Sequence, residues 1–266
     1  LLLISKPAGR QTAEKIAARV MTCKKPVVIC LMKGEVSVPR AVTAATIEDA
    51  AYKAVALAND EEAISIPDNY WGDYLEQALE LSGQLQPPQK YLCGLFTGGT
   101  LADEAMVVAS RTLGPIRSNI PLNPEWVLAL GAESRSHTVV DLGDDEFTRG
   151  RPHPMIDPTP RNERIIKAFA NENTAVILCD VVTGFGSHVD PAGELSRAVS
   201  QARSLYPTNN PVVIAFVCGT DADPQPASEQ ITSLKKVGIF VVPSNALAAR
   251  LAAEIIQHKA LKEGRT

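Results

Sequence analysis

The sequence has little of what several classes of protein depend on. Aromatic residues make up only 5% of its 266 residues, no C-x-x-C pair occurs, and no dense run of lysine and arginine appears. The net charge is −4 at pH 7, so we expect no nucleic-acid partner. No apolar run approaches the ~18 residues that a membrane span needs, so we expect no membrane partner either.

The cysteines also argue against two classes of site, a disulfide framework and a metal centre. There are five of them, an odd number without metal-ligand spacing, and four lie in or beside apolar runs: Cys30, Cys93, Cys179 and Cys218, with Cys23 as the fifth. This pattern favours buried free thiols over a disulfide framework or a metal site. Free thiols persist in a reducing compartment, so we expect a cytoplasmic protein.

Apolar residues, by contrast, are plentiful. They make up 45% of the chain and charged residues 21%, which is enough for a sizeable core in one large domain or two small ones. The first residues, Leu-Leu-Leu-Ile-Ser, have the character of a core strand, and neither a starting Met nor a signal-peptide pattern precedes them. We therefore expect that an N-terminal part of the protein is missing from this sequence.

Strand-like runs and helical periodicities alternate along the chain. Residues 175–179 are apolar at consecutive positions, which is typical of strands buried on both faces of a parallel sheet. The predicted strands are 1–5, 26–32, 91–96, 138–142, 175–182, 211–218 and 239–242. The predicted helices are 13–20, 46–58, 74–81, 100–113, 161–170, 191–205, 226–236 and 244–258. The sequence thus predicts an α/β fold of two three-layer, doubly wound, flavodoxin-like units with mostly parallel sheets.

The composition suggests where these units begin and end. Residues 1–59 form a partial α/β unit, the polar segment 60–89 that contains Pro-Pro is a linker, and residues 90–258 form the second α/β domain. Residues 259–266 have the character of a frayed tail.

Two glycine-containing turns follow predicted strands of the second domain. Gly98, Gly99 and Thr100 follow the first strand, and Gly184, Gly186 and Ser187 follow the third, with Asp190 and Pro191 marking the next helix start. Ligands of such sheets collect at the carboxyl ends of the strands, and helix N-termini there favour phosphate or carboxylate. The alternative is an ordinary turn with no ligand, in which Thr100 caps its helix.

A long charged loop, residues 143–157, lies at the same edge. Asp144 and Asp157 offer carboxylates, Arg149 and Arg151 offer guanidinium groups, and His153 stands between two prolines that restrict its backbone. The arginines suit a phosphate or carboxylate, and the carboxylates suit Mg²⁺. The alternative is a solvated loop whose charges pair among themselves. No named metal or nucleotide motif is satisfied.

Four stretches together carry a family resemblance: GLFTGGTLADEAM, HTVVDLGDDEFTRGRPHPMIDP, VILCDVVTGFGSHVDPAGEL and VCGTDADPQ. They resemble the FdrA family (FdrA/YahF-like), which is described as acyl-CoA synthetase-like and is related to the α and β subunits of succinyl-CoA synthetase. The resemblance covers nearly the whole chain. It implies α- and β-type CoA-ligase units in one bacterial polypeptide, with an N-terminal CoA-binding domain before residue 1.

The departures from succinyl-CoA synthetase concern its phosphohistidine. That histidine follows the strand matching residues 27–32, where this chain has none, and the position of its supporting carboxylate reads Ser5-Lys6-Pro7. No ATP-grasp domain is visible. The relay of that enzyme therefore requires that His153 or His188 has taken over the phosphoryl group.

Three functional expectations follow. In the first, the protein is an acid–thiol ligase acting on an acyl phosphate or CoA thioester, with CoA and Mg²⁺ as cofactors. His153 is then the phosphoryl acceptor or acid/base, Arg149 and Arg151 neutralise charge, and Asp144 and Asp157 orient these groups or bind Mg²⁺. In the second, it is one subunit of an oxamate carbamoyltransferase of purine and allantoin breakdown, with carbamoyl phosphate as donor. In the third, it is a non-catalytic scaffold subunit. All three expect an oligomer or a partner subunit.

Overall fold

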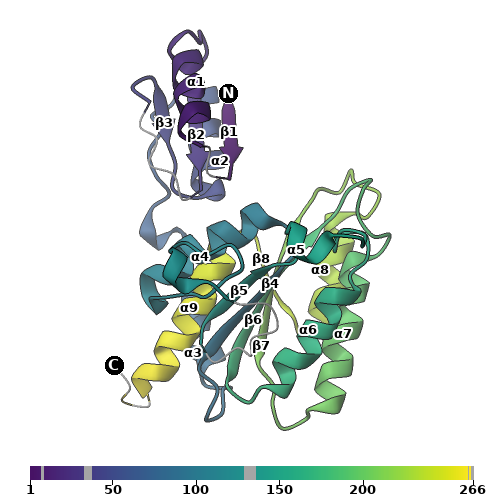
Figure 1. Ribbon diagram of the computed structural model, residues 1–266. Helices are drawn as coiled ribbons and strands as arrows, with labels where there is room; N and C mark the ends of the chain where they lie inside the picture. The colour runs from purple at the N-terminus through teal and green to yellow at the C-terminus, as the bar shows by residue number, and fades with distance from the viewer. Residues whose placement is uncertain (7–8, 33–37, 129–135, 263, 265–266) are drawn as a thin grey trace. The chain divides into compact units, whose positions relative to one another are not determined.

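The computed structural model describes residues 1–6, 9–32, 38–128, 136–262 and 264, and it divides into two compact units, Leu1–Gly72 and Asp73–Thr266 (Figure 1). Each unit has one sheet in which all paired strands run parallel. The prediction of an α/β fold with two mainly parallel sheets is therefore confirmed. None of the helices in the described ranges is long and apolar enough to span a membrane.

The first unit is a three-stranded sheet between two helices. Its strands lie in the order β1 (Leu2–Ser5), β2 (Val27–Leu31), β3 (Ala41–Thr43), and β3 was not predicted because it is only three residues long. Successive side chains of β2 alternate between faces. Ile29 packs with Val20 of α1 (Arg10–Met21), and Cys30 packs with Ala50 of α2 (Ile47–Ala58). Both faces of β2 are covered, which explains its unbroken apolar run. As predicted, Thr46 caps α2 by accepting from the Asp49 N–H.

The second unit has a five-stranded sheet in the order β5-β4-β6-β7-β8. Counted within this unit, the order is 2-1-3-4-5, the flavodoxin-like arrangement. The strands are β4 (Tyr91–Phe96), β5 (Thr138–Asp141), β6 (Thr174–Val182), β7 (Val212–Cys218) and β8 (Phe240–Val242). Winding reverses between β4 and β6, so the carboxyl ends of these two strands form the switch point of the sheet.

Helices cover both faces of this sheet (Figure 1). On one face α4 (Gly99–Leu113) packs against α9 (Asn245–Lys262), and on the other α6 (Thr159–Ala170), α7 (Pro191–Leu205) and α8 (Ala227–Lys236) lie in a row. A core cluster that includes Phe169 of α6 and Leu195 of α7 fills the second interface. The short helix α5 (Asp145–Thr148) lies in the charged loop.

The outer edge of β5 is paired although no further strand lies there within the described ranges. The Arg117 N–H donates to the His137 carbonyl at 2.9 Å, and the Val139 N–H donates to the Arg117 carbonyl at 3.0 Å. The Asn119 side chain then exchanges two hydrogen bonds of 3.0 Å with the N–H and C=O of Asp141. An irregular segment and one amide side chain thus replace a neighbouring strand.

The segment between the two predicted domains contains regular structure. A 3-10 turn, η1 (Asp68–Trp71), leads into α3 (Gly72–Ser82), and the Tyr70 ring packs edge-on against Tyr52 at 6.2 Å. The end of α9 binds the end of α3 and the residues after it, because Lys262 donates to the Ser82 hydroxyl and Lys259 donates to the Leu85 carbonyl. These contacts extend α9 to Lys262, four residues beyond the predicted end at 258, so the expected frayed tail is wrong for these four residues. Residues 263, 265 and 266 of that tail lie outside the described ranges.

The five cysteines are free thiols, as predicted. Cys30, Cys93 and Cys179 are buried, and burial raises the pKa of Cys93 to about 11 and that of Cys179 to about 12. The prediction of burial is wrong for Cys218, which is exposed because it ends β7 at the carboxyl edge of the sheet.

Candidate functional site

The switch point of the five-stranded sheet carries the first glycine turn. β4 ends at Phe96 and α4 begins at Gly99, with Gly98 as its N-cap in an extended conformation. No side chain caps α4, so the expected cap by Thr100 is wrong: Thr100 lies one residue inside the helix. The first N–H groups of a helix have no acceptor within it, and they carry the positive end of its dipole.

Asp180 of β6 holds this turn from the neighbouring strand. Its carboxylate accepts hydrogen bonds from the Thr97 N–H at 2.8 Å, the Thr97 hydroxyl at 3.0 Å and the Gly98 N–H at 2.7 Å. Asp180 is fully buried, and burial raises its pKa, while Arg161 and the three hydrogen bonds favour the charged form. The two N–H groups that precede α4 are therefore already occupied by the protein.

Arg161 lies behind Asp180 and balances its charge. The Arg161 guanidinium donates to the Asp180 carbonyl at 2.7 Å and lies 3.9 Å from the carboxylate Oδ1. Arg161 is only 2% exposed, so both charges are desolvated. Sequence reasoning missed this pair, although one signal was present: Asp180 stands inside an otherwise apolar strand, where a lone carboxylate needs a partner.

His153 packs beside the same turn through Gly143. A Cβ atom on Gly143 would lie 2.5 Å from His153 Nε2 and 2.8 Å from the Thr97 carbonyl oxygen. The imidazole and the Thr97 carbonyl therefore both lie against Gly143, and a side chain at this position would collide with them. The structure thus brings together two of the predicted parts, His153 and the Gly98 turn.

Both loop histidines use Nδ1 in the same way. Nδ1 of His153 accepts from the Met155 N–H at 3.2 Å, and Nδ1 of His188 accepts from the Asp190 N–H at 3.1 Å. In a neutral imidazole whose Nδ1 accepts, the proton resides on Nε2. Nε2 is then a hydrogen-bond donor in both residues and has no free lone pair for attack on phosphorus.

The predicted carboxylates accept hydrogen bonds from nearby backbone N–H groups. Asp144 caps α5 by accepting from the Glu146 N–H at 3.1 Å, and Asp157 accepts from the Thr159 N–H at 3.1 Å at the start of α6. The hydrogen bonds from Thr159 lower the pKa of Asp157. Among the described residues no group of His, Cys, Asp and Glu side chains is arranged to hold a metal ion. These carboxylates therefore do not fit the Mg²⁺ role.

The predicted arginines lie at the surface of the charged loop. Arg149 and Arg151 are exposed. Arg151 lines a cavity beside α6. Within the described part of the chain neither forms an ion pair with Asp144 or Asp157, although the charge of Arg151 contributes to the low pKa of Asp157.

The second glycine turn is held mostly by the protein itself. The Gly184 N–H donates to Gln225 Oε1 at 2.9 Å, and Gln225 Nε2 donates back to the carbonyls of Gly184 and His188. Gly184 has φ +121°, a conformation that glycine favours. Ser187 closes the turn by donating its N–H to the Gly184 carbonyl, and Gly186 has open space around it.

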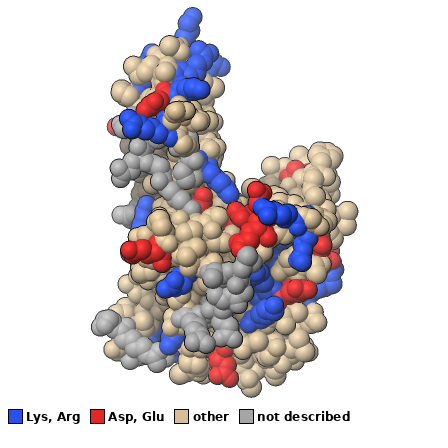
Figure 2. All heavy atoms as spheres, viewed as in Figure 1, with Lys and Arg blue, Asp and Glu red and all other residues tan. Residues whose placement is uncertain are grey.

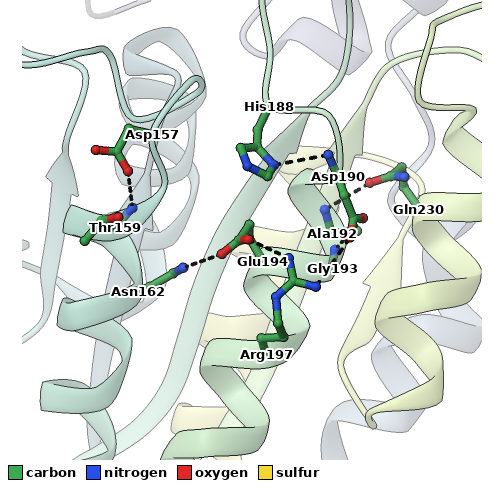
Figure 3. A network of polar contacts seen from close by, with 10 residues as sticks. All are labelled: Asp157, Thr159, Asn162, His188, Asp190, Ala192, Gly193, Glu194, Arg197 and Gln230. Atoms are coloured by element: carbon green, nitrogen blue, oxygen red, sulfur yellow. Dashed lines mark hydrogen bonds and ion pairs between the residues drawn. The ribbon is translucent and has the colours of Figure 1, made fainter.

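The N-terminus of α7 is capped, unlike that of α4 (Figure 3). As predicted, Asp190 is the cap, and it accepts from the Gly193 N–H at 3.0 Å. The Ala192 N–H donates to Gln230 Oε1 at 2.9 Å. Pro191 has no N–H, so the first turn of α7 offers little to an anion.

A polar network joins α6 to α7 below these loops (Figure 3). Asn162 of α6 donates to Glu194 of α7 at 3.2 Å, and Arg197 binds Glu194 and lies 3.6 Å from Asp190. Above it, the His188 N–H donates to the Met155 carbonyl at 2.7 Å, which joins the charged loop to the Gly184 loop. The two loops are thus fixed to each other and to α7.

Comparisons with known proteins fit this architecture. The model of the CoA-ligase family matches residues 95–255, more than half of the chain. The chain is 38% identical over 263 residues to YahF of Escherichia coli (strain K12), described as an uncharacterized protein, and the match covers 96% of this chain and 50% of YahF. The chain thus spans about half the length of this relative.

A solved structure is similar over 99% of this chain and 54% of its own length, at 13% identity and a TM-score of 0.41. It is the apo form of the dinucleotide-forming acetyl-coenzyme A synthetase 1 of Ca. Korarchaeum cryptofilum. The family match rests on residues 95–255, which begin in β4 and include the switch point, both glycine turns and the charged loop. This chain belongs to the CoA-ligase family.

Proposed function

We propose that this chain is part of an acyl-CoA synthetase-like enzyme of the FdrA type that binds an acyl phosphate at the N-terminus of α4. The observation that carries the proposal is the uncapped start of this 15-residue helix at the switch point of the sheet. A helix N-terminus in that position is the usual anion site of open α/β sheets. The capped α7 offers no comparable place.

The charges beneath the turn are compatible with an anion above it. Asp180 alone would repel a phosphate, but Arg161 balances its charge from behind. Asp180 also fixes the Thr97 and Gly98 N–H groups, so the following turn of α4 is oriented in advance. Donors that need no rearrangement stabilise developing charge best.

In this proposal His153 donates a hydrogen bond and is not a phosphoryl acceptor. Its Nε2–H lies next to Gly143 and the Thr97 carbonyl, beside the turn that would hold the phosphate. A hydrogen bond from this neutral Nε2–H to the leaving phosphate oxygen would stabilise the charge that develops there as the acyl group is transferred. The exposed side chains of Arg149 and Arg151 supply further positive charge near the loop.

CoA enters the proposal as the acyl acceptor, on the strength of the family. Mg²⁺ does not, because Asp144 and Asp157 accept hydrogen bonds from backbone N–H groups and no set of His, Cys, Asp and Glu side chains among the described residues is arranged to hold a metal ion. No step is assigned to either group.

A second candidate function is favoured by the histidines. Nε2 carries the proton in both His153 and His188, so neither nitrogen is free to accept a phosphoryl group. Direct transfer of a carbamoyl group from carbamoyl phosphate to oxamate needs no phosphohistidine and therefore suits this site. The phosphate of that donor would bind at the same turn of α4. The two functions differ in the acceptor and share the anion site.

Calorimetric titration of the full-length protein with acetyl phosphate, carbamoyl phosphate and CoA tests the proposal. The variant Thr100→Glu places a carboxylate in the first turn of α4, where it suits the helix dipole but repels phosphate. Ser187→Glu is the matched control at the Gly184 loop. We expect Thr100→Glu to weaken acyl phosphate binding at least tenfold and Ser187→Glu to change it less than threefold.

The opposite ranking would assign the phosphate to the Gly184 loop and contradict the proposal. Binding of CoA together with acetyl phosphate would select the ligase, whereas binding of carbamoyl phosphate without CoA would select the transferase. Binding of none of the three would favour the scaffold.

Phosphohistidine formation is tested separately. After incubation with acetyl phosphate or carbamoyl phosphate, ³¹P NMR of the wild-type protein should show no phosphoramidate signal. A signal lost in His153→Asn would contradict the role of His153 as hydrogen-bond donor, and one lost in His188→Asn would assign the phosphoryl acceptor to His188.

A further inference from the structure

A cavity of about 830 Å³ lies between α6 and the part of the sheet formed by β4 and β5. It borders the face that α6, α7 and α8 cover, whereas the turn at residues 97–100 leads into α4 on the opposite face. None of residues 97–100 lines it. The cavity is therefore separate from the proposed acyl phosphate site, although Arg151 of the charged loop lies at its wall.

The floor of the cavity is apolar. Leu95 of β4 and Val140 of β5 come from the sheet, and Leu128 and Phe147 contribute from the loops. The Cys93 thiol and the Thr138 hydroxyl lie on the same floor and are hydrogen-bonded to each other. Such a floor suits a hydrocarbon or aromatic body.

The wall of the cavity is cationic. Arg151, Arg164 and Lys167 line it, against one carboxylate, that of Glu163. Figure 2 shows Lys and Arg atoms along α6 and next to α5, where Asp and Glu atoms also gather. Lys167 and Glu163 are exposed, whereas Arg164 is only partly so. An anion entering the cavity would therefore meet more positive than negative charge.

Arg164 is the best-placed of these cations. Its guanidinium lies over the Phe147 ring, 4.9 Å from the centroid, in a cation–π contact. Within the described part of the chain no carboxylate forms an ion pair with it; Glu146 and Glu163 act only at longer range. Burial lowers the pKa of Arg164, as expected for a cation that has lost water without gaining an anion.

We propose that this cavity binds an organic anion with an apolar body, whose carboxylate or phosphate group pairs with Arg164 and whose body lies on Leu95 and Val140. The volume is in the range of sites for cofactor-sized molecules and is far larger than phosphate or acetate needs. A planar guanidinium suits a two-oxygen anion. This site does not depend on the proposed acyl phosphate chemistry.

The test uses 8-anilinonaphthalene-1-sulfonate, an organic anion whose fluorescence rises in apolar surroundings, with the 266-residue chain. Its uncharged analogue N-phenyl-1-naphthylamine is titrated in parallel. The variant Arg164→Gln removes the charge from the cavity, and Lys236→Gln removes an exposed charge from α8 as the matched control. Circular dichroism checks that each variant keeps its fold.

We expect Arg164→Gln to weaken binding of the anionic probe at least tenfold, with less than a twofold effect on the neutral probe and no effect of Lys236→Gln. Hexanoate should displace the anionic probe, and 1-hexanol should do so far less well. Equal effects of Arg164→Gln and Lys236→Gln, or equal binding of both probes, would show an unspecific apolar surface and overturn the proposal. If Arg164→Gln fails to fold, Ala170→Trp, which narrows the cavity from its exposed rim, must weaken the anionic probe instead.

Discussion

The guanidinium of Arg161 lies 3.9 Å from the carboxylate of Asp180 and donates to the carbonyl of the same residue. Both side chains are almost completely buried, so neither charge is solvated by water. This pair is the support of the switch point, because Asp180 in turn holds the N–H groups of Thr97 and Gly98.

We expect removal of either partner to destabilise the protein. Asp180→Asn leaves Arg161 uncompensated and presents an amide to donors, and Arg161→Met leaves the carboxylate uncompensated; each should lower the free energy of unfolding by about 3–5 kcal/mol. Urea unfolding followed by circular dichroism gives these values. The double variant should lose much less than the sum, and strict additivity would mean that the two side chains do not act as a pair.

Gly143 should tolerate no side chain. Alanine there places its Cβ against the Thr97 carbonyl, which belongs to the backbone and cannot swing aside, and against His153. We expect a loss of about 1–3 kcal/mol in the free energy of unfolding and displacement of the His153 ring, visible in its NMR signals. Gly186→Ala, in open space, is the control and should change stability by less than about 0.5 kcal/mol. Equal losses would show that the contact at Gly143 is not tight.

We expect the effect of Gly193→Ala on stability to change sign when the Asp190 cap of α7 is removed. Asp190→Ala removes the cap and should cost about 1 kcal/mol. Gly193→Ala should also destabilise the wild type, since its Cβ would lie 1.8 Å from Asp190 Oδ2. In the Asp190→Ala background that collision is gone, and alanine is the better helix former, so Gly193→Ala should become neutral or stabilising by up to about 1 kcal/mol. Thermal unfolding of the four proteins measures the cycle.

His137 should make the protein sensitive to mild acid. Burial lowers its pKa from 6.5 to about 4, and its Nδ1 accepts from the Leu92 N–H. A depressed histidine pKa means that the fold favours the neutral form. Stability is therefore full above pH 6.5 and is lost as the pH falls toward 4, by up to about 3 kcal/mol.

Urea midpoints between pH 7 and pH 4 test this. His137→Asn keeps an acceptor and removes the titration, so its midpoint should fall less over the same range. Parallel curves for wild type and variant would assign the acid sensitivity to other groups.

Local signals were enough for much of the fold. The unbroken apolar run before Asp180 predicted a strand buried on both faces, and Asp190-Pro191 fixed the start of α7 within one residue. Both depend on neighbours in the sequence. The strand β3 lacked such a signal, because three residues are too few for a pattern.

The support of the site could not be predicted in the same way. Asp180 and Thr97 are 83 positions apart, and Gly184 and Gln225 are 41 apart, so only the fold reveals that they bond. For the same reason the sequence favoured both glycine turns equally as anion sites. In the structure the two differ, because Asp190 and Gln230 bind the first N–H groups of α7 and no side chain caps α4. The charges of the loop were visible in the sequence, but the backbone N–H groups that Asp144 and Asp157 bind were not.

The pairing along the outer edge of β5 has a consequence for assembly. The N–H of Val139, the C=O of His137 and both backbone groups of Asp141 already have partners in Arg117 and Asn119. An incoming strand from another chain would have to displace them, so this edge of the sheet resists extension and the aggregation that exposed edges invite. Replacing Asn119 would reopen the last position of that edge, where a second molecule could begin to add.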